Sequence, residues 1–231
     1  MSQKAPQGTF VALVPMRHHS VRVSGKNFRE LAGVPLYHYV LRTLMACPSL
    51  SEIVVDTDSE AIREGLQRAF PQVRVIDRPA SLRGDDVPMT EILFHDTSQV
   101  PADYYLQTHS TNPFLKPETI ERAIQWWMDA REQFDSLFSV TRIQARLWSH
   151  TGHPVNHDPS VLLQTQALSP IYLENSCLYL FPAALIRSTR RRVGVRPKLF
   201  EIDPIEGIDI DEERDFAFAE LLIRAQEMAR T

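Results

Sequence analysis

The chain has 231 residues, of which 43% are hydrophobic and 23% charged, and its formal net charge is -4 at pH 7. This length and composition can bury a sizeable core and fit one large domain with a small insertion. The acidic balance argues against a general nucleic-acid binder, which normally carries a basic excess. The sequence contains no apolar stretch long enough to span a bilayer, and residues 1–8 lack the apolar segment of a signal peptide, so we expect a cytoplasmic protein without a membrane partner.

Strand and helix signals alternate along the first part of the chain. Short β-branched runs indicate buried strands, and apolar residues at helical spacing indicate helices. In chain order these signals predict the strand Thr9–Val14, the helix Pro35–Met45, the strand Glu52–Asp58, the helix Ser59–Phe70, the strand Val73–Asp77, the helix Pro88–Thr97, the strand Tyr104–Gln107, a helix beginning at Pro117 and the strand Ser136–Thr141. We therefore expect an α/β fold with a mainly parallel sheet, because right-handed crossovers place helices on both faces.

The alternation stops after this last strand. The segment from Arg142 to Tyr172 is irregular, and it contains the three histidines His150, His153 and His157. Asp158 is the one other residue there at metal-ligand spacing, so a polar surface explains the histidines better than a zinc site does. A strand at Glu174–Phe181 and a helix from about Glu212 to Met228 complete the predicted elements.

Two further features have simple structural explanations. Cys47 and Cys177 lie in apolar contexts without a C-x-x-C motif, so we expect buried free thiols. The basic run Arg187–Arg196 has little aromatic interleaving, so an exposed helix end or turn is a better interpretation than a nucleic-acid site.

A cationic loop follows the first predicted strand. Arg17, Arg22 and Lys26 lie in a segment that has no carboxylate and that also contains Ser20 and Gly25. Ligands of open α/β sheets bind beyond the carboxyl ends of the strands, and Arg and Lys bind phosphate oxygens there. The loop therefore suits a polyphosphate, although it has no Walker pattern and a solvated basic loop would have the same composition.

Two aspartates near the C-terminus form a second candidate site. If this segment is extended, Asp209 and Asp211 point to one face while Ile208 and Ile210 point to the other. Mg²⁺ is commonly held by one or two carboxylates together with phosphates and water. Asp211 could instead cap the following helix, but capping does not account for Asp209. We therefore predict that Asp209 and Asp211 hold Mg²⁺ beside a triphosphate bound to the cationic loop.

The cationic loop resembles the nucleotide-binding loop of the cytidylyltransferases that activate acidic sugars. Members acting on Kdo have a spacing similar to Arg17-x-x-Ser20-x-Arg22-x-x-Gly25-Lys26. The acylneuraminate members end the loop in Lys-Asn, as Lys26-Asn27 does here. His18 and His19 replace small residues of the acylneuraminate pattern.

Four later segments resemble the acylneuraminate members in the same order, so the resemblance extends from Val11 to Glu220. In that family the first of these segments helps to hold cytidine. The glutamine of the second and the asparagine of the third face the sugar, and the fourth binds the catalytic Mg²⁺. The matching residues are Arg78, Pro79, Leu82 and Asp85; Gln107; Asn175; and Gly207-Ile208-Asp209-Ile210-Asp211 with Asp215-Phe216. The segment His109–Asn112 and Ser176, which replaces a glycine, depart from the pattern.

This resemblance implies a Rossmann-like nucleotide-diphospho-sugar transferase fold and a cytidylyltransferase of CMP-sugar biosynthesis for cell-surface polysaccharide. The enzyme would join CMP from CTP to an acidic 2-keto sugar, release pyrophosphate and use Mg²⁺. It also implies a homodimer in which the insertion near 142–172 packs against the second subunit. The implied catalytic residues are Arg17, Lys26, Asp209 and Asp211; the nucleotide contacts are Arg17, Ser20, Arg22, Lys26, Asn27, Arg78 and Asp85; the sugar contacts are Gln107 and Asn175. Two alternatives stay open: a nucleotidylyltransferase for another nucleotide or a sugar 1-phosphate, and a non-catalytic nucleotide-binding relative.

Overall fold

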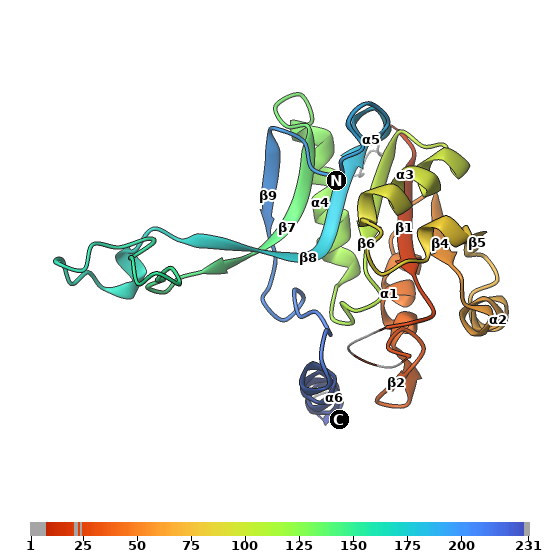
Figure 1. Cartoon of the computed structure of the whole chain (residues 1–231), viewed down its shortest axis with the longest axis horizontal. Coiled ribbons are helices and arrows are strands. Elements are labelled where there is room, and N and C mark those ends of the chain that lie inside the picture. Colours follow the sequence, from red (N-terminus) through yellow and green to blue (C-terminus); the bar gives the residue numbers. More distant parts are fainter. Residues whose placement is uncertain (1–7, 21–22, 24, 229–231) are drawn as a thin grey trace, which may run out of the picture.

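A computed structural model describes residues 8–20, 23 and 25–228, and a seven-stranded sheet in the order β5-β4-β1-β6-β8-β7-β9 forms its centre (Figure 1). The strands are β1 (Phe10–Met16), β4 (Glu52–Thr57), β5 (Arg74–Asp77), β6 (Tyr104–Thr108), β7 (Ser136–Ile143), β8 (Ile171–Pro182) and β9 (Pro197–Glu201). β8 is antiparallel to β6 and β7, and the other ladders of this sheet are parallel. The prediction of a mainly parallel sheet is confirmed.

Helices cover both faces of this sheet, as the alternating pattern predicted. Their bounds are α1 (Leu36–Met45), α2 (Glu60–Ala69), α3 (Met89–Gln99), α4 (Pro117–Ala130), α5 (Ala183–Thr189) and α6 (Glu213–Met228). Alternate residues of β1 separate the two core layers: Phe10 and Ala12 pack with α1, α2 and α4, whereas Val11 and Leu13 pack with α3 and α5. The fully buried β1 therefore lies between two apolar layers.

The strand order places a topological switch beside β1. β4 pairs with one edge of β1 and β6 with the other, although β6 follows β5 in the chain. The loops that leave the carboxyl ends of β1, β5 and β6 consequently emerge at one edge of the sheet. This is the position at which open α/β sheets bind their ligands.

The segment 208–211 is irregular and lies outside the sheet, yet Ile210 is buried between Asp209 and Asp211, which agrees with the alternation expected of an extended segment. The backbone N–H of Ile210 donates to the carbonyl of Thr111 at 2.9 Å, and Asn112 Nδ2 donates to the carbonyl of Ile208 at 3.1 Å. Ile210 is fully buried in a cluster with α6 and the short β2–β3 ribbon (Glu30–Leu31 and Val34–Pro35). These contacts hold the segment beside the carboxyl end of β6.

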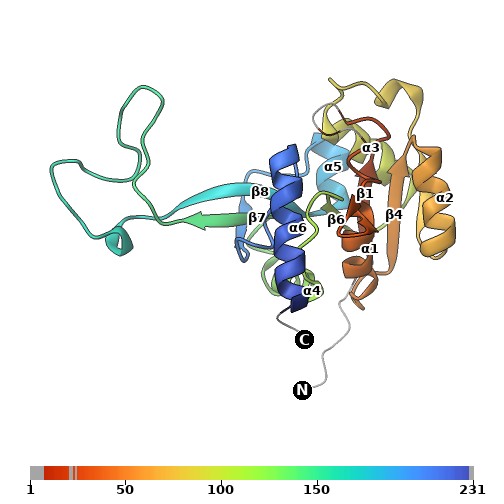
Figure 2. The ribbon, with the colours of Figure 1, turned by 90° about the horizontal axis from the view of Figure 1, so that it is seen from below.

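β7 and β8 extend beyond the body of the molecule and carry an arm, residues 144–170, that projects away from the sheet (Figures 1 and 2). The arm is mostly irregular, with a single bridge between Trp148 and Pro154 and the 3-10 helix η2 (Thr165–Ala167). Its exposed apolar side chains are those of Trp148, Val155, Val161, Leu162 and Leu163. The arm therefore displays apolar surface away from the core.

The described residues also bear on the cysteines and on the helices as candidate membrane spans. Cys47 and Cys177 are buried and form no disulfide. The helices of the described chain include none that is both long and apolar enough to cross a membrane.

Candidate active site

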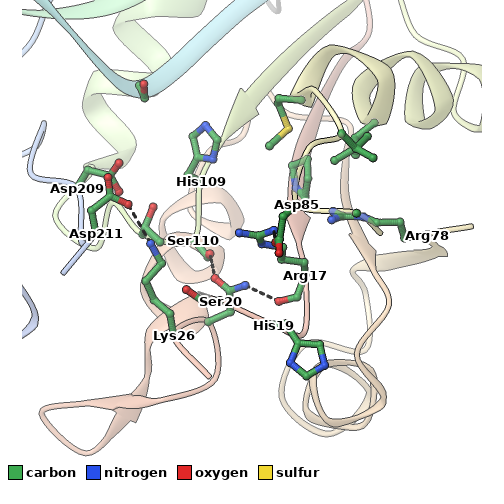
Figure 3. Close-up of a pocket in the computed structure, with 18 of the residues that line it drawn as sticks. Arg17, His19, Ser20, Lys26, Arg78, Asp85, His109, Ser110, Asp209 and Asp211 are labelled. Carbon is green, nitrogen blue, oxygen red and sulfur yellow. Dashed lines mark hydrogen bonds and ion pairs between the residues drawn. The ribbon is translucent and has the colours of Figure 1, made fainter. Parts of the chain in front are cut away.

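A cavity of about 400 Å³ opens at the carboxyl edge of the sheet, beside the switch point (Figure 3). Its walls come from the loops after β1, β5 and β6, from α3, from β8 and from the segment before α6. Among the predicted site residues, the cavity is lined by Arg17, Ser20, Lys26, Asn27, Arg78, Asp85, Asp209 and Asp211. Sequence segments separated by almost 200 residues thus meet in one site. Arg22, also predicted to bind nucleotide, lies outside the described residues.

The cations of the loop after β1 are held by acidic partners. Arg17 Nη1 forms an ion pair with Asp85 Oδ1. Lys26 Nζ donates to the carbonyl of Ile210 at 2.6 Å and to Asp211 Oδ1 at 3.1 Å. In Figure 3, Lys26 lies next to Asp209 and Asp211, and Arg17 lies beside Asp85. Arg17 and Lys26, the cations of this loop that the structure describes, are therefore positioned before a ligand arrives, and both can donate to phosphate oxygens in the cavity.

Asn27 fixes the path of this loop. Its Nδ2 donates to the carbonyl of Arg17 at 2.7 Å, and its Oδ1 accepts a hydrogen bond from Ser110 Oγ at 2.7 Å. The side chain is 7% exposed, so the amide joins the loops after β1 and β6. The predicted nucleotide contact of Asn27 stays a prediction, and its side chain has a positioning role.

Arg78 reaches the cavity from the end of β5 and is anchored in the interior. The residue is 3% exposed, and its Nε donates to Asp56 Oδ1 on β4. Burial, together with the charge of Asp56, raises the pKa of Asp96 to about 9, so this carboxyl is protonated at neutral pH. Asp56 Oδ2 is buried and accepts no other hydrogen bond from the residues that the structure describes, which makes the Asp96 proton its available donor.

Asp56, His95 and Asp96 also form a group with potential metal-ligand atoms within 4.8 Å of one another. Arg78 already places a positive charge against Asp56, and Asp96 is protonated. The donor set therefore fits a buried anchor for Arg78 better than a metal site.

Asp209 and Asp211 fit a magnesium site better. Both side chains are half-buried and line the cavity on the wall opposite Arg17 and Asp85 in Figure 3. Two carboxylates leave most coordination positions to phosphate oxygens and water, which is the usual arrangement for Mg²⁺. The backbone N–H groups just before α6 are satisfied by a third aspartate. Asp215 Oδ2 accepts hydrogen bonds from the N–H groups of Asp211 and Glu212 at 3.0 and 2.8 Å.

Gln107 lies behind the cavity wall, and both ends of its amide are engaged. Arg192 Nη1 donates to its Oε1 at 2.5 Å, and its Nε2 donates to His109 Nε2 at 2.9 Å. Gln107 is fully buried, whereas His109 and Arg192 line the cavity. Burial and the nearby positive charges of Arg192 and Lys26 lower the pKa of His109 to about 3, so the ring is neutral at physiological pH. The structure thus places Gln107 as the support for two residues that face the ligand space.

Asn175 similarly lies between strands rather than among the residues that line the cavity. Its Oδ1 accepts from Ser139 Oγ at 2.6 Å and from the backbone N–H of Cys177 at 3.2 Å, and its Nδ2 donates to Thr141 Oγ1 at 3.1 Å. The neighbouring Ser176 lines the cavity. Its φ of 56° is in the left-handed region, which explains why a glycine suits this position in the pattern that the sequence resembles.

Arg192 and His109 are site residues that the sequence did not identify. Arg192 belongs to the basic run interpreted as an exposed helix end, and that interpretation holds for Arg190 and Arg191, which are exposed. Arg190 has a φ of 54° at the end of α5, and this left-handed residue turns the chain before Arg192. In a run of three arginines the sequence does not indicate which side chain points into the protein. A histidine after a predicted strand, such as His109, likewise does not indicate whether it lines a site or the surface.

The whole chain is similar to known cytidylyltransferases. A family model described as cytidylyltransferase matches residues 11–229. A CMP-N,N'-diacetyllegionaminic acid synthase of Legionella pneumophila is 29% identical over 230 residues, which cover 95% of this chain and 98% of that protein. An N-acylneuraminate cytidylyltransferase of Oncorhynchus mykiss is 28% identical over 222 residues, covering 90% of this chain but 49% of the relative, so the chain spans about half the length of that fish protein.

A solved structure of CMP:2-keto-3-deoxy-manno-octonic acid synthetase complexed with CTP has the same fold. Its TM-score to this chain is 0.73, with 17% sequence identity over 95% of this chain and 99% of the other. This likeness confirms the expected nucleotidyltransferase α/β fold. Because the family model extends over nearly all of the sequence, the chain belongs to the cytidylyltransferase family and is a nucleotidyltransferase.

Proposed function

We propose that this protein transfers CMP from CTP to an acidic 2-keto sugar and releases pyrophosphate. The observation that carries the proposal is the meeting of Arg17 and Lys26 with Asp209 and Asp211 around one cavity, in a chain that belongs to the cytidylyltransferases. The relatives named as legionaminate and acylneuraminate enzymes support an acidic sugar as the acceptor.

The reaction is an in-line displacement at the α-phosphorus of CTP. The anomeric hydroxyl oxygen of the sugar forms the new P–O bond, the bond to the β-phosphate breaks, and the hydroxyl proton is released. Arg17 and Lys26 bind the triphosphate and offset the charge that develops on the leaving pyrophosphate. Arg78 and Asp85 hold the cytidine side of the nucleotide, which aligns the α-phosphorus with the acceptor.

Asp209 and Asp211 are the residues that would hold Mg²⁺ in this site. When bound, the ion supplies Lewis-acid polarisation of the phosphate and favours ionisation of the attacking hydroxyl. Lys26 contacts Asp211 directly, so the same contact couples the position of the phosphate-binding cation to the carboxylate pair.

The test is pyrophosphate release with Mg²⁺, using CTP, UTP, ATP and GTP each against a panel of acids and sugar 1-phosphates. The acids are N-acylneuraminate, legionaminate, pseudaminate and 3-deoxy-manno-octulosonate. We expect release with CTP and one acid. Release with another nucleotide or with a sugar 1-phosphate would overturn the assignment of the substrates, and nucleotide binding without turnover would favour a non-catalytic relative.

We also propose that the arm makes this single-domain protein a homodimer. Leu162 is 91% exposed and Val161 is 51% exposed, and apolar surface of this kind is stabilised by burial against a second copy. Light scattering after gel filtration should give a dimer for the wild type and a monomer for the double variant Val161→Asp/Leu162→Asp. The matched control is Val195→Asp, because Val195 is 85% exposed on the body of the molecule. A monomeric wild type, or a dimeric arm variant, would contradict this assembly.

The predicted cytoplasmic location is a separate expectation.

A further inference from the structure

Four described cations line the cavity, and one of them differs from the others in its charge balance. Arg17 pairs with Asp85, Lys26 with Asp211 and Arg78 with Asp56. Arg192 forms no ion pair with any carboxylate in the part of the chain that the structure describes. The acid that acts on Arg192 through space is Glu174, which is not in ion-pair contact with it. A half-buried cation without a carboxylate in contact loses part of its hydration, and in the described residues no directly paired opposite charge replaces it.

The position of Arg192 is nevertheless tightly defined. Its guanidinium carbon lies 3.5 Å from the centroid of the Tyr179 ring, and its Nη1 donates to Gln107 Oε1 at 2.5 Å. Tyr179 is itself fully buried and donates from its hydroxyl to Glu174 Oε1. A guanidinium has five N–H donors, and the hydrogen bond to Gln107 uses one of them. Arg192 makes no further side-chain hydrogen bond to the described residues, and because it lines the cavity it retains donors for a ligand.

The same network determines the proton position on His109. A guanidinium can only donate, so the atom of Gln107 that faces Arg192 is the amide oxygen. The amide nitrogen therefore donates to His109 Nε2, which must be the unprotonated nitrogen, and Nδ1 carries the proton. His109 Nδ1 makes no hydrogen bond to the described residues, and the ring lines the cavity. His109 thus offers the cavity a neutral N–H donor.

We propose that Arg192 binds the carboxylate of the acidic sugar and that the Nδ1 N–H of His109 is a second donor beside it. The planar guanidinium matches the two oxygens of a carboxylate, and the incoming acid supplies the opposite charge that Arg192 lacks. Neutral sugars are rejected because they would occupy the site while leaving the cation unbalanced. Gln107 is the positioning residue that aligns both donors. This assignment rests on the proposed function, since it names the group by which the same site selects its acceptor.

The test measures KM for the sugar acid and for CTP separately, with the acid that the wild type turns over. We expect Arg192→Met to raise KM for the acid by about 30-fold or more, the ratio that corresponds to about 2 kcal/mol, and to leave KM for CTP unchanged. The methyl ester of the same acid supplies the decisive comparison. The wild type should prefer the acid over the ester by a similar factor, and the preference should collapse in Arg192→Met.

Arg191→Met is the matched control, because Arg191 is exposed and belongs to the same basic run. It should keep both KM values. Arg192→Lys retains the charge but loses the planar pair of donors, so it should give a smaller rise in KM for the acid and serves if Arg192→Met does not fold.

The possible failures are distinguishable. If the wild type turns over an acid and Arg192→Met keeps its KM and its preference for the acid over the ester, the proposed function stands and the Arg192 assignment is overturned. A rise in KM for CTP alone would make Arg192 a phosphate ligand and would also overturn it. If the wild type turns over none of the acids, the proposed function fails and the assignment fails with it.

Discussion

The cavity holds its arginines by two different kinds of chemistry. On the side of β1, β4 and β5, Arg17 and Arg78 each contact a carboxylate of the protein. On the side of β6 and β8, Arg192 is held by the Gln107 amide and the Tyr179 ring. Carboxylates lock cations in place while reducing their net charge, which a multiply charged triphosphate tolerates. An amide and a ring position a cation without reducing its charge, which suits a ligand that carries a single negative charge.

The largest expected effect is a loss of kcat when Asp209, one of the two aspartates on the wall opposite Arg17, is replaced. Asp209→Asn should lower kcat by about 10³-fold if the proposed site holds Mg²⁺, because an amide is a poor Mg²⁺ ligand and the metal would supply charge stabilisation in the transition state. Initial rates of pyrophosphate release over a range of Mg²⁺ concentrations measure this loss.

Glu212→Gln is the control for Asp209→Asn, since its side chain is exposed and its partner Arg214 is also exposed. It should retain wild-type kcat and Mg²⁺ dependence. If Asp209→Asn kept normal Mg²⁺-dependent turnover, the metal assignment would be wrong.

The second prediction concerns the ion pair between Arg78 and Asp56, on the side of the cavity proposed to bind the nucleotide. In Asp56→Asn the neighbouring Asp96 can ionise and restore part of the pairing, so the informative variant is Asp56→Asn/Asp96→Asn. It leaves the buried Arg78 without a carboxylate and should lower the free energy of unfolding by about 3–5 kcal/mol. Asp85→Asn breaks the exposed pair with Arg17 and should cost less than about 1 kcal/mol. Urea unfolding compares them, and equal losses would contradict the distinction.

The third prediction concerns Gln107, which positions the two residues proposed to bind the sugar acid. Gln107→Leu removes the hydrogen bonds that position Arg192 and His109 and should raise KM for the sugar acid by about 10- to 100-fold, the range seen when a supporting hydrogen bond is lost. KM for CTP should change little. Gln107→Glu retains an acceptor for Arg192 but adds a negative charge, so it should impair the acid more than the ester. A Gln107→Leu enzyme with a wild-type KM for the acid would show that Gln107 does not position the sugar site.

The sequence predicted the elements and residues whose signals are local. Asp209 and Asp211 were identified because alternation places both on one face. The two side chains keep this arrangement although the segment is not a strand, because Ile210 between them is anchored in the core. Most of the strands and helices predicted before residue 142 follow their hydrophobic periods, because their apolar residues pack into one of the two core layers.

Features that depend on tertiary contacts could not be predicted in this way. Arg192 lines the cavity because the left-handed turn at Arg190 redirects the chain before it. Gln107 lies behind the cavity wall, where its amide is hydrogen-bonded to Arg192 and His109. The sequence also gave no reason to expect that Asp96, on a predicted helix, would meet Asp56 and remain protonated.

That protonated acid also predicts a gradual effect, a dependence of stability on pH. Asp96 has a pKa raised to about 9 in the folded protein, whereas in the unfolded chain its pKa is about 4. Between these values the folded state holds a proton that the unfolded state has released, so stability falls as the pH rises, by up to about 1.4 kcal/mol per pH unit. Asp96→Asn keeps the donor to Asp56 beside Arg78 and His95 but cannot titrate. Thermal unfolding from pH 6 to 8.5 should therefore show a steeper decline for the wild type than for Asp96→Asn, and parallel profiles would mean that Asp96 is ionised and that Arg78 is balanced by two carboxylates.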